Sequence, residues 1–279
     1  MTPPDVRLRT VSWKPGRPTR DEREGGFPFD VPTVASLDVL ELRSPVTFFV
    51  GENGSGKSTL LEAIALAAGL PAVGAADLAR DATLQPQRRL ASALRLVWSA
   101  RETRGFFLRA EDFFGFVQRL AAERAGMQRE LERIDAEYRA ASRAPKALEL
   151  ATTPLRASLA DMTRRYGADL DANSHGQSFL ALFRSRIQPN GLYLLDEPEA
   201  ALSPQSQLGL MAMMLDAVAD GAQFLVATHA PILLGLPDAD IVSFDETPPA
   251  RVAFDELPHV VLTRDFLNDR ERFLRHLRD

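Results

Sequence analysis

Short, continuous apolar runs alternate with helix-like stretches along most of the chain. The apolar runs are Val46–Val50, 192–195 and 224–228, and the helical stretches are 59–68, 178–187 and 206–219. Apolar runs without alternation are typical of strands that are buried on both faces, as in a parallel sheet. Strands that alternate with helices therefore predict an α/β fold with a mostly parallel sheet and flanking helices.

Other segments predict strands of a different kind. Residues 6–13 alternate apolar and polar positions, as a strand with one exposed face does. Residues 94–99 and 105–109 are separated by a short polar segment, which predicts an antiparallel hairpin. Further elements are expected at 241–244 and 251–254 (strands) and from about Arg264 onward (an amphipathic helix).

Residues 111–171 shift in composition to Ala, Arg, Glu and Leu, with helical periodicity over the first half. Pro145 and Pro154 are expected to interrupt this stretch, because proline removes a helix hydrogen bond. A helical subdomain or a short helical hairpin is expected here, not a long coiled-coil arm. The predicted organisation is a core of residues 1–110 and 172–279, with 111–171 inserted as a helical subdomain.

Composition is that of an ordinary globular protein, since 45% of the 279 residues are hydrophobic and 25% are charged. The net charge of −5 gives no general attraction for nucleic acids or anionic lipids. The absence of cysteine excludes disulfides and thiol chemistry and is compatible with a reducing compartment. Glu62 and Pro71 interrupt the longest apolar stretch, and the first residues lack a signal-peptide pattern. We expect a cytoplasmic protein without direct membrane insertion.

Residues 51–59 read Gly-Glu-Asn-Gly-Ser-Gly-Lys-Ser-Thr and match the phosphate-binding pattern G-x-x-x-x-G-K-[ST]. The match lies between a predicted strand and a predicted helix, which is the context that the pattern requires. Glycines let backbone N–H groups turn toward phosphate oxygens, and the helix N-terminus adds a partial positive charge. Lys57 is expected to reach the β- and γ-phosphates and Ser58 to bind Mg²⁺. The predicted ligand is ATP or GTP with Mg²⁺.

Two acidic residues follow the apolar run 192–195, at the sheet edge where α/β proteins bind ligands. Asp196 is a candidate Mg²⁺ ligand, directly or through water, and Glu197 is a candidate general base or orienter of the attacking water. His229 ends the next long strand and is a candidate to contact the γ-phosphate or position the water. A single histidine in such a place is more often structural.

The segment 173–178, Asn-Ser-His-Gly-Gln-Ser, precedes a predicted helix. Ser174 and the backbone N–H groups of the first helical turn would form a second phosphate-binding cup. The alternative is that Ser174 or Ser178 only caps the helix.

In this order, the motifs resemble those of the ATP-binding cassette ATPases, and in particular their soluble SMC/RecF-type branch. The similarity extends from residue 27 to about residue 245, and the phosphate loop and the segment 196–204 are typical of that branch. It implies that Asp196 and Glu197 form the Walker B pair and that His229 is the switch histidine. The implied contacts to ATP are Gly51, Asn53, Gly54, Ser55, Gly56, Lys57, Ser58 and Thr59 from the Walker A loop, and Ser174, Gly176 and Gln177 from the signature motif.

The resemblance also implies how such a site works. Ser58 and Asp196 would hold Mg²⁺, and Glu197, His229 and Lys57 would act in ATP hydrolysis. Two copies would associate head to tail around ATP, with the signature motif of one copy contacting the γ-phosphate bound by the other. Binding and hydrolysis in this homodimer would drive a conformational cycle.

Three positions depart from the family pattern. His175 stands where the signature motif has glycine, and Ser203 stands where the family has the D-loop aspartate. The Q-loop glutamine has no clear counterpart, because Gln85 and Gln87 precede the strands, so Arg109 or Glu111 is expected to take its place. For the adenine ring, Phe27 or Phe29 is the candidate stacking residue, with core packing as the alternative.

Two other functions would use the same motifs. The chain could be the ATP-binding subunit of a membrane transporter, although the signature and the segment after Asp196 are closer to the soluble branch. It could also be an SMC/RecF-like ATPase in DNA repair or defence, which the acidic net charge does not favour.

Overall fold

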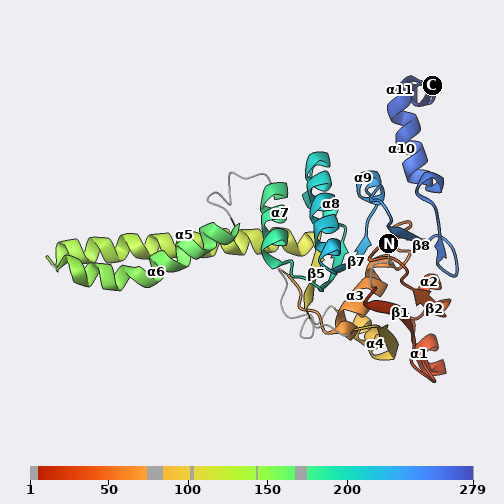
Figure 1. The fold of residues 1–279 in the computed structure, drawn as a ribbon, viewed down its shortest axis with the longest axis horizontal. Coiled ribbons are helices and arrows are strands. Elements are labelled where there is room, and N and C mark those ends of the chain that lie inside the picture. Colours follow the sequence, from red (N-terminus) through yellow and green to blue (C-terminus); the bar gives the residue numbers. More distant parts are fainter. Residues whose placement is uncertain (1–5, 74–83, 101–103, 143, 167–174, 279) are drawn as a thin grey trace.

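The computed structural model describes residues 6–73, 84–100, 104–142, 144–166 and 175–278. Its main element is a six-stranded sheet in the order β5-β6-β7-β3-β8-β9 (Figure 1). The strands are β3 (Val46–Val50), β5 (Gly105–Arg109), β6 (Leu192–Asp196), β7 (Gln223–Ala227), β8 (Asp240–Ser243) and β9 (Ala250–Arg251). All neighbours in this sheet are parallel except β8 and β9. The predicted α/β fold with a mostly parallel sheet is confirmed.

A second, antiparallel sheet has the order β2-β1-β4, built from β1 (Leu8–Trp13), β2 (Val39–Glu41) and β4 (Leu94–Trp98). The predicted hairpin between 94–99 and 105–109 is wrong, because β4 pairs with β1 and β5 pairs with β6. The burial of the two strands gives the reason. Side chains of β4 alternate between buried and more exposed positions, whereas Phe106, Phe107 and Leu108 of β5 are all buried. The two strands therefore suit different sheets.

Helix α3 (Lys57–Ala68) lies between the two sheets. Its Leu61 and Ile64 share one apolar cluster with Leu8 of β1, Leu94 of β4 and Leu225 of β7. The helices on this side also include α1 (Arg20–Glu24), α2 (Pro32–Ala35) and α4 (Gln85–Ala93). Burial on both sides holds the first turn of α3 firmly at the carboxyl end of β3.

The opposite face of the six-stranded sheet is covered by α7 (His175–Arg186), α8 (Pro204–Ala219) and α9 (Pro231–Leu234). Phe183 of α7 contacts the rings of Phe106, Tyr193 and Phe224 in this second apolar cluster. Alternate residues of one strand enter opposite clusters, as Phe48 and neighbouring residues of β3 do. The sheet is therefore buried on both faces, as its uninterrupted apolar runs predict.

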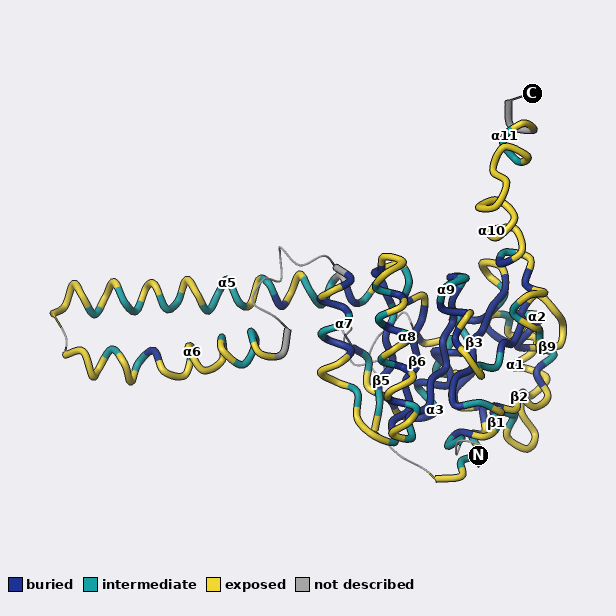
Figure 2. Tube along the Cα trace, turned by 45° about the horizontal axis from the view of Figure 1, so that its top comes forward, coloured by how far each residue is buried: buried dark blue, intermediate teal, exposed yellow. Residues whose placement is uncertain are grey.

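Helices α5 (Ala110–Ala140) and α6 (Pro145–Tyr166) project from the core as a helical hairpin (Figures 1 and 2). This is one of the two arrangements that the composition predicts. At ~1.5 Å per residue, the 31 residues of α5 span about 46 Å. Pro145 begins α6, but Pro154 lies inside it, so the expected interruption there is wrong. The carbonyl freed by Pro154 belongs to Leu150, whose side chain is 70% exposed, so water can replace the missing donor.

The C-terminal segment forms two helices, α10 (Pro258–Asn268) and α11 (Arg270–Arg278), that extend away from the sheet (Figure 1). The first of them begins six residues before the predicted start at Arg264. Two short 3-10 helices, η2 (Pro198–Ala201) and η3 (Phe254–Glu256), complete the described elements. No helix among the described residues is both long and apolar enough to cross a membrane.

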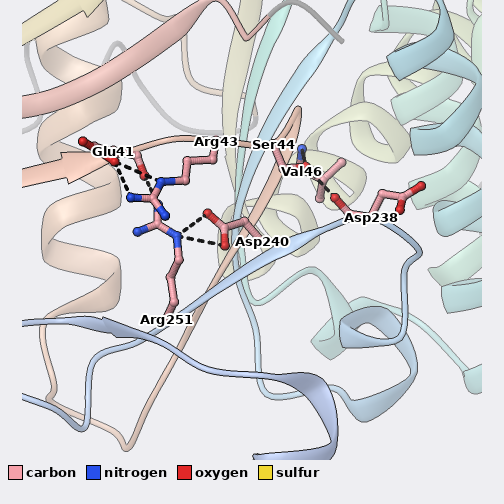
Figure 3. A network of polar contacts seen from close by, with 7 residues as sticks. All are labelled: Glu41, Arg43, Ser44, Val46, Asp238, Asp240 and Arg251. Atoms are coloured by element: carbon pink, nitrogen blue, oxygen red, sulfur yellow. Dashed lines mark hydrogen bonds and ion pairs between the residues drawn. The ribbon is translucent and has the colours of Figure 1, made fainter. Parts of the chain in front are cut away.

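A polar network joins the two sheets at their edges (Figure 3). Arg251 of β9 forms an ion pair with Asp240 of β8 (2.9 Å) and donates to the backbone carbonyl of Glu41 in β2 (2.5 Å). Ser44 donates to the carbonyl of Asp238 (2.7 Å), which ties the segment before β3 to the segment before β8. Because this network is largely exposed, it orients the sheets more than it stabilises them.

Truncation of Phe183 is expected to destabilise the fold strongly. Phe183→Ala removes a fully buried ring from the aromatic cluster, which should lower the free energy of unfolding by about 3–5 kcal/mol. Leu208→Ala in α8 removes a side chain that is 57% exposed and should cost less than ~1 kcal/mol. Urea unfolding followed by circular dichroism measures both, and equal losses would contradict the core described here.

Candidate active site

The loop between β3 and α3 has a backbone that requires glycine. Gly51, Gly54 and Gly56 have φ angles of 142°, 86° and 100°. A Cβ at Gly56 would lie 2.7 Å from a methyl group of Val31 and 2.8 Å from the hydroxyl of Thr33. The same hydroxyl donates to the carbonyl of Ser55. Close packing against α2 and positive φ angles together hold this loop in a tight curve around the first turn of α3.

Lys57 is folded into this loop. Its side chain is 4% exposed, and Nζ donates to the carbonyls of Gly51 (2.5 Å) and Glu52 (2.8 Å). Burial lowers the pKa of Lys57, and nearby carboxylates, first Glu197 and then Asp245, oppose that shift. The ammonium is therefore a point charge surrounded by the curved backbone, where a phosphate group would gain most from it.

Ser58 and Asp196 join α3 to the end of β6. The Ser58 hydroxyl donates to Oδ1 of Asp196 over 2.9 Å. Burial raises the pKa of Asp196 to about 7, and the Ser58 hydrogen bond opposes the shift, while Glu62 and Glu197 add to it. A carboxylate and a hydroxyl are hard oxygen ligands that suit Mg²⁺, and a cation there would relieve the buried negative charge. Among the described residues, no group of three or more His, Asp or Glu side chains is arranged to hold a metal ion by itself. Mg²⁺ commonly takes its other ligands from water and substrate phosphates.

Glu197 follows directly and has a left-handed backbone, with φ 49°. Its N–H donates to the carbonyl of Ala227 (2.9 Å), which extends the pairing between β6 and β7 beyond the strand end. The Glu197 side chain is exposed and lines a cavity of about 560 Å³ together with Glu52, Asn53, Glu199 and His229. A positive φ in a residue other than glycine is strained, and such strain is concentrated at active sites and ligand-binding positions.

His229 reaches this cavity from the end of β7. Its backbone N–H donates to Oε1 of Glu199 (2.7 Å), and the N–H of Ala230 donates to the hydroxyl of Thr228 (3.1 Å). The structure therefore brings Asn53, Glu197 and His229 to one cavity. Glu199 was not among the sequence candidates, although its place directly after the Asp-Glu-Pro segment could have indicated it.

Asp245 is a second residue that the sequence candidates missed. Its Oδ1 accepts a hydrogen bond from the N–H of Glu52 (2.6 Å) and would lie 3.0 Å from a Cβ at Gly51. Strand β8 pairs in parallel with β3, so the residue after β8 reaches the phosphate loop. A carboxylate just beyond a predicted strand was the available signal, but the neighbouring strand was not known.

Glu62 and Arg109 form an ion pair behind the site. Glu62 is 5% exposed on α3, and burial raises its pKa although Arg109 and a hydrogen bond from Gln87 oppose the shift. Arg109 ends β5 directly opposite Asp196 in the strand register. Of the two residues expected in the Q-loop position, Arg109 thus lies beside the site, whereas Glu111 is exposed in the first turn of α5. The role of Arg109 stays a prediction.

The signature segment lies apart from this cavity. Ser174 is outside the described residues, and Gly176 and Gln177 fall in the first turn of α7. Gly176 is buried, and a Cβ there would be 2.7 Å from the hydroxyl of Ser206 in α8. Ser178 lies within α7, so its predicted alternative role as a cap is wrong.

The structure also places Ser203 and the two candidate stacking residues, Phe27 and Phe29. Ser203 caps α8, because its hydroxyl accepts from the N–H of Ser206 (3.2 Å). Phe29 belongs to the core at 2% exposure, with its ring 6.2 Å from that of Trp13. Phe27 is 46% exposed and so remains the candidate for stacking on a base. Thr59, within α3, is half-buried one residue beyond Ser58.

Loss of Arg109 is expected to destabilise the protein. Arg109→Ala leaves the buried carboxylate of Glu62 without its ion-pair partner, which should lower the free energy of unfolding by about 3–5 kcal/mol. Arg133→Ala is the control, because its ion pairs with Glu130 (2.5 Å) and Glu137 (2.7 Å) are on the exposed face of α5. That variant should lose less than ~1 kcal/mol. Chemical unfolding measures the free energy of unfolding of both variants. Equal losses in Arg109→Ala and Arg133→Ala would contradict the burial of the Glu62–Arg109 pair.

Asp196 is expected to make stability depend on pH. Its pKa of about 7 lies above the ordinary value of 3.8, so its favourable contribution is complete below pH 3.8 and disappears as pH rises through 7. Asp196→Asn stays neutral and should gain stability relative to the wild type between pH 4 and pH 8, by as much as ~4 kcal/mol. Urea unfolding without nucleotide or Mg²⁺ tests this. If the free energy of unfolding depends on pH in the same way in the wild type and in Asp196→Asn, the raised pKa of Asp196 is contradicted.

The family model that matches this chain covers the phosphate-binding region. This model, described as an AAA domain, matches residues 33–75, which include most of α2, the loop and all of α3. Among solved structures, the ATP-binding cassette MJ1267 of an ABC transporter is 17% identical, with a TM-score of 0.45, covering 92% of this chain and 97% of that chain. The SMC head domain from Thermotoga maritima is 16% identical, with a TM-score of 0.40, covering 88% of this chain and 98% of that chain.

Sequence similarity to a transporter ATP-binding protein covers much more of the chain than the family model does. The hemin import ATP-binding protein HmuV from Nocardia farcinica is 30% identical over 251 residues, which cover 88% of this chain and 78% of that protein. This range includes the loop, both acidic residues and His229, the groups that meet around the cavity. The chain therefore belongs to the ATP-binding cassette family of P-loop ATPases.

Proposed function

We propose that this chain binds Mg²⁺ and ATP at residues 51–59 and hydrolyses ATP at a composite site formed by two copies. The observation that carries this proposal is the Ser58–Asp196 hydrogen bond, which joins the two oxygen ligands expected for Mg²⁺. Lys57 lies beside them in the phosphate loop, and Glu197 and His229 line the cavity in front of it. These are the groups that phosphoryl transfer to water needs: a phosphate cradle, a cation site and a base.

Each group has a separate role in this proposal. Lys57 and the backbone of Gly51, Gly54 and Gly56 hold the phosphates, with Asn53, Ser55 and Thr59 as further contacts. Ser58 and Asp196 hold Mg²⁺, which when bound neutralises charge on the phosphate oxygens. Glu197 accepts a proton from the attacking water, and His229 orients the water or donates to the γ-phosphate.

The second copy would complete the site. Gly176 and Gln177 lie in α7, and neither residue lines the cavity that contains Glu197 and His229. This supports the proposal that the signature residues Ser174, Gly176 and Gln177 of one copy contact the nucleotide bound by the other. Head-to-tail association around ATP, followed by hydrolysis, would then open and close the pair. We also propose residues 1–110 and 172–279 as the core and 111–171 as an inserted subdomain, in keeping with the projecting hairpin of α5 and α6.

Replacement of Glu197 tests the proposed chemistry. Glu197→Gln should lower the rate of ATP hydrolysis by about 100-fold or more, since it removes the base, and should leave ATP binding intact. Glu52→Gln is the matched control, because Glu52 lines the same cavity with an exposed carboxylate. Lys57→Ala should abolish binding itself. Phosphate release and nucleotide-binding titrations with Mg²⁺ measure these effects. Wild-type turnover in Glu197→Gln would overturn its role as base.

One observation favours a second candidate function. HmuV is an ATP-binding protein of hemin import, and its similarity to this chain covers 88% of the chain. The chain would then be the ATP-binding subunit of a membrane importer. Purification of Glu197→Gln with ATP, which should trap the dimer, distinguishes the two: a membrane subunit in the trapped complex favours the importer, and a homodimer alone favours a free-standing ATPase.

A further inference from the structure

The start of α10 contacts the proposed switch histidine. The rings of His229 and His259 lie with their centroids 6.4 Å apart and their planes at 66°, an edge-to-face arrangement. His259 is the second residue of α10 and does not line the cavity shared by Glu197 and His229. A ring outside the proposed nucleotide site therefore packs directly against one inside it.

Hydrogen bonds hold the backbone at His229 and at the residue after it. Glu199 accepts from the His229 N–H (2.7 Å), and Thr228 accepts from the next N–H in the chain (3.1 Å). The Nε2 atoms of both His229 and His259 are buried and have no hydrogen-bond partner among the described residues. No hydrogen bond at Nε2 to a described residue orients the His229 ring, and its edge-to-face contact with His259 is a packing contact that can orient it.

Asp245 connects His259 to the phosphate loop by a second route. Its carboxylate accepts from the N–H of Glu52 (2.6 Å) and interacts electrostatically with both Lys57 and His259. Burial, helped by His229, lowers the pKa of His259, and Asp245 opposes that shift. His259 thus lies between two elements of the site, the loop and the end of β7.

Helix α10 is anchored to the core only at its start. Leu257 and Val260 are 2% and 3% exposed and anchor the helix beside His259, whereas the residues that follow are exposed (Figure 2). A groove of about 640 Å³, lined in part by Val260 and Leu267, shares Glu199 and His229 with the nucleotide cavity. A rotation of the His229 ring therefore alters the contacts on which the first turn of α10 rests.

We propose that His259 is a positioning residue that holds the His229 ring toward the nucleotide cavity and couples α10 to the nucleotide bound there. This inference rests on the proposed ATPase site. It assigns the C-terminal helices a place in the ATP cycle, since a change at His229 reaches α10 without passing through the sheet.

Histidine signals in NMR spectra test the coupling without measuring turnover. The chain has 4 histidines, so single substitutions assign each ring. Addition of a non-hydrolysable ATP analogue with Mg²⁺ should shift the ring signals of His229 and His259. In His229→Ala, measured at an analogue concentration that a nucleotide-binding titration shows to fill the site, the shift of the His259 signal should fall to a small part of its wild-type value. A His259 signal that does not move in the wild type while that of His229 does, or that moves as far in His229→Ala as in the wild type, would overturn the inference.

Steady-state kinetics provides the second test. His259→Ala should lower kcat by about 10-fold, by analogy with the cost of a misplaced group, and leave KM for ATP unchanged. His259→Phe keeps a ring in contact and should retain most of the wild-type kcat. In combination with His229→Ala, His259→Ala should cause no additional loss. Leu267→Ala, two turns further along α10 in the same groove, is the control and should keep the wild-type kcat.

The outcomes separate this inference from the proposed function. Additive losses in the double variant, or wild-type kcat in His259→Ala, would overturn the role of His259 while leaving the ATPase proposal standing. Wild-type protein that neither binds nor hydrolyses ATP would remove both. If His259→Ala does not fold, His259→Phe in the His229→Ala background and the NMR measurement still decide.

Discussion

The hydrogen bond from Ser58 to Asp196 is the contact on which the site depends. It joins the first turn of α3 to the end of β6, two segments that come from distant parts of the chain. The contact is maintained by its surroundings, since α3 is packed between two sheets and β6 is buried on both faces. Burial of the Asp196 carboxylate is electrostatically unfavourable and raises its pKa, and a cation beside the carboxylate would stabilise its charged form.

Parallel pairing explains why so many polar groups meet at one edge. Strands β6, β7, β3 and β8 are neighbours that run in the same direction. Asp196, His229, the phosphate loop and Asp245 therefore all lie at or just beyond the carboxyl ends of these strands. Two projections leave this compact arrangement: the hairpin of α5 and α6, and the C-terminal pair of α10 and α11 (Figure 1). The hairpin begins directly after Arg109, which lies opposite Asp196 in the sheet. Helix α10 begins at Pro258, and its second residue, His259, contacts His229. Each projection therefore starts next to the site.

Several of these features could be predicted from the sequence because their signals are local. The loop pattern, the apolar runs and the acids after Leu195 need only neighbouring residues to be interpreted, and the structure brings Lys57, Asp196 and His229 to one edge of the sheet. The pairing of strand β5 could not be predicted from neighbouring residues alone. Its proximity to β4 predicted a hairpin, but its three consecutive buried residues fit a sheet that is covered on both faces, and β5 pairs in parallel with β6 at the edge of that sheet.

The sequence by itself determined the class of fold, the phosphate loop and the residues at strand ends, because periodicity and motif spacing are properties of short segments. Tertiary structure alone decided the ion pair of Glu62 with Arg109, the hydrogen bond from Glu52 to Asp245 and the contact of His229 with His259. Those contacts join segments far apart in the chain, and they exist only once the order of strands is known. Burial then sets their energies, because a carboxylate or an imidazole out of water depends on its few remaining neighbours.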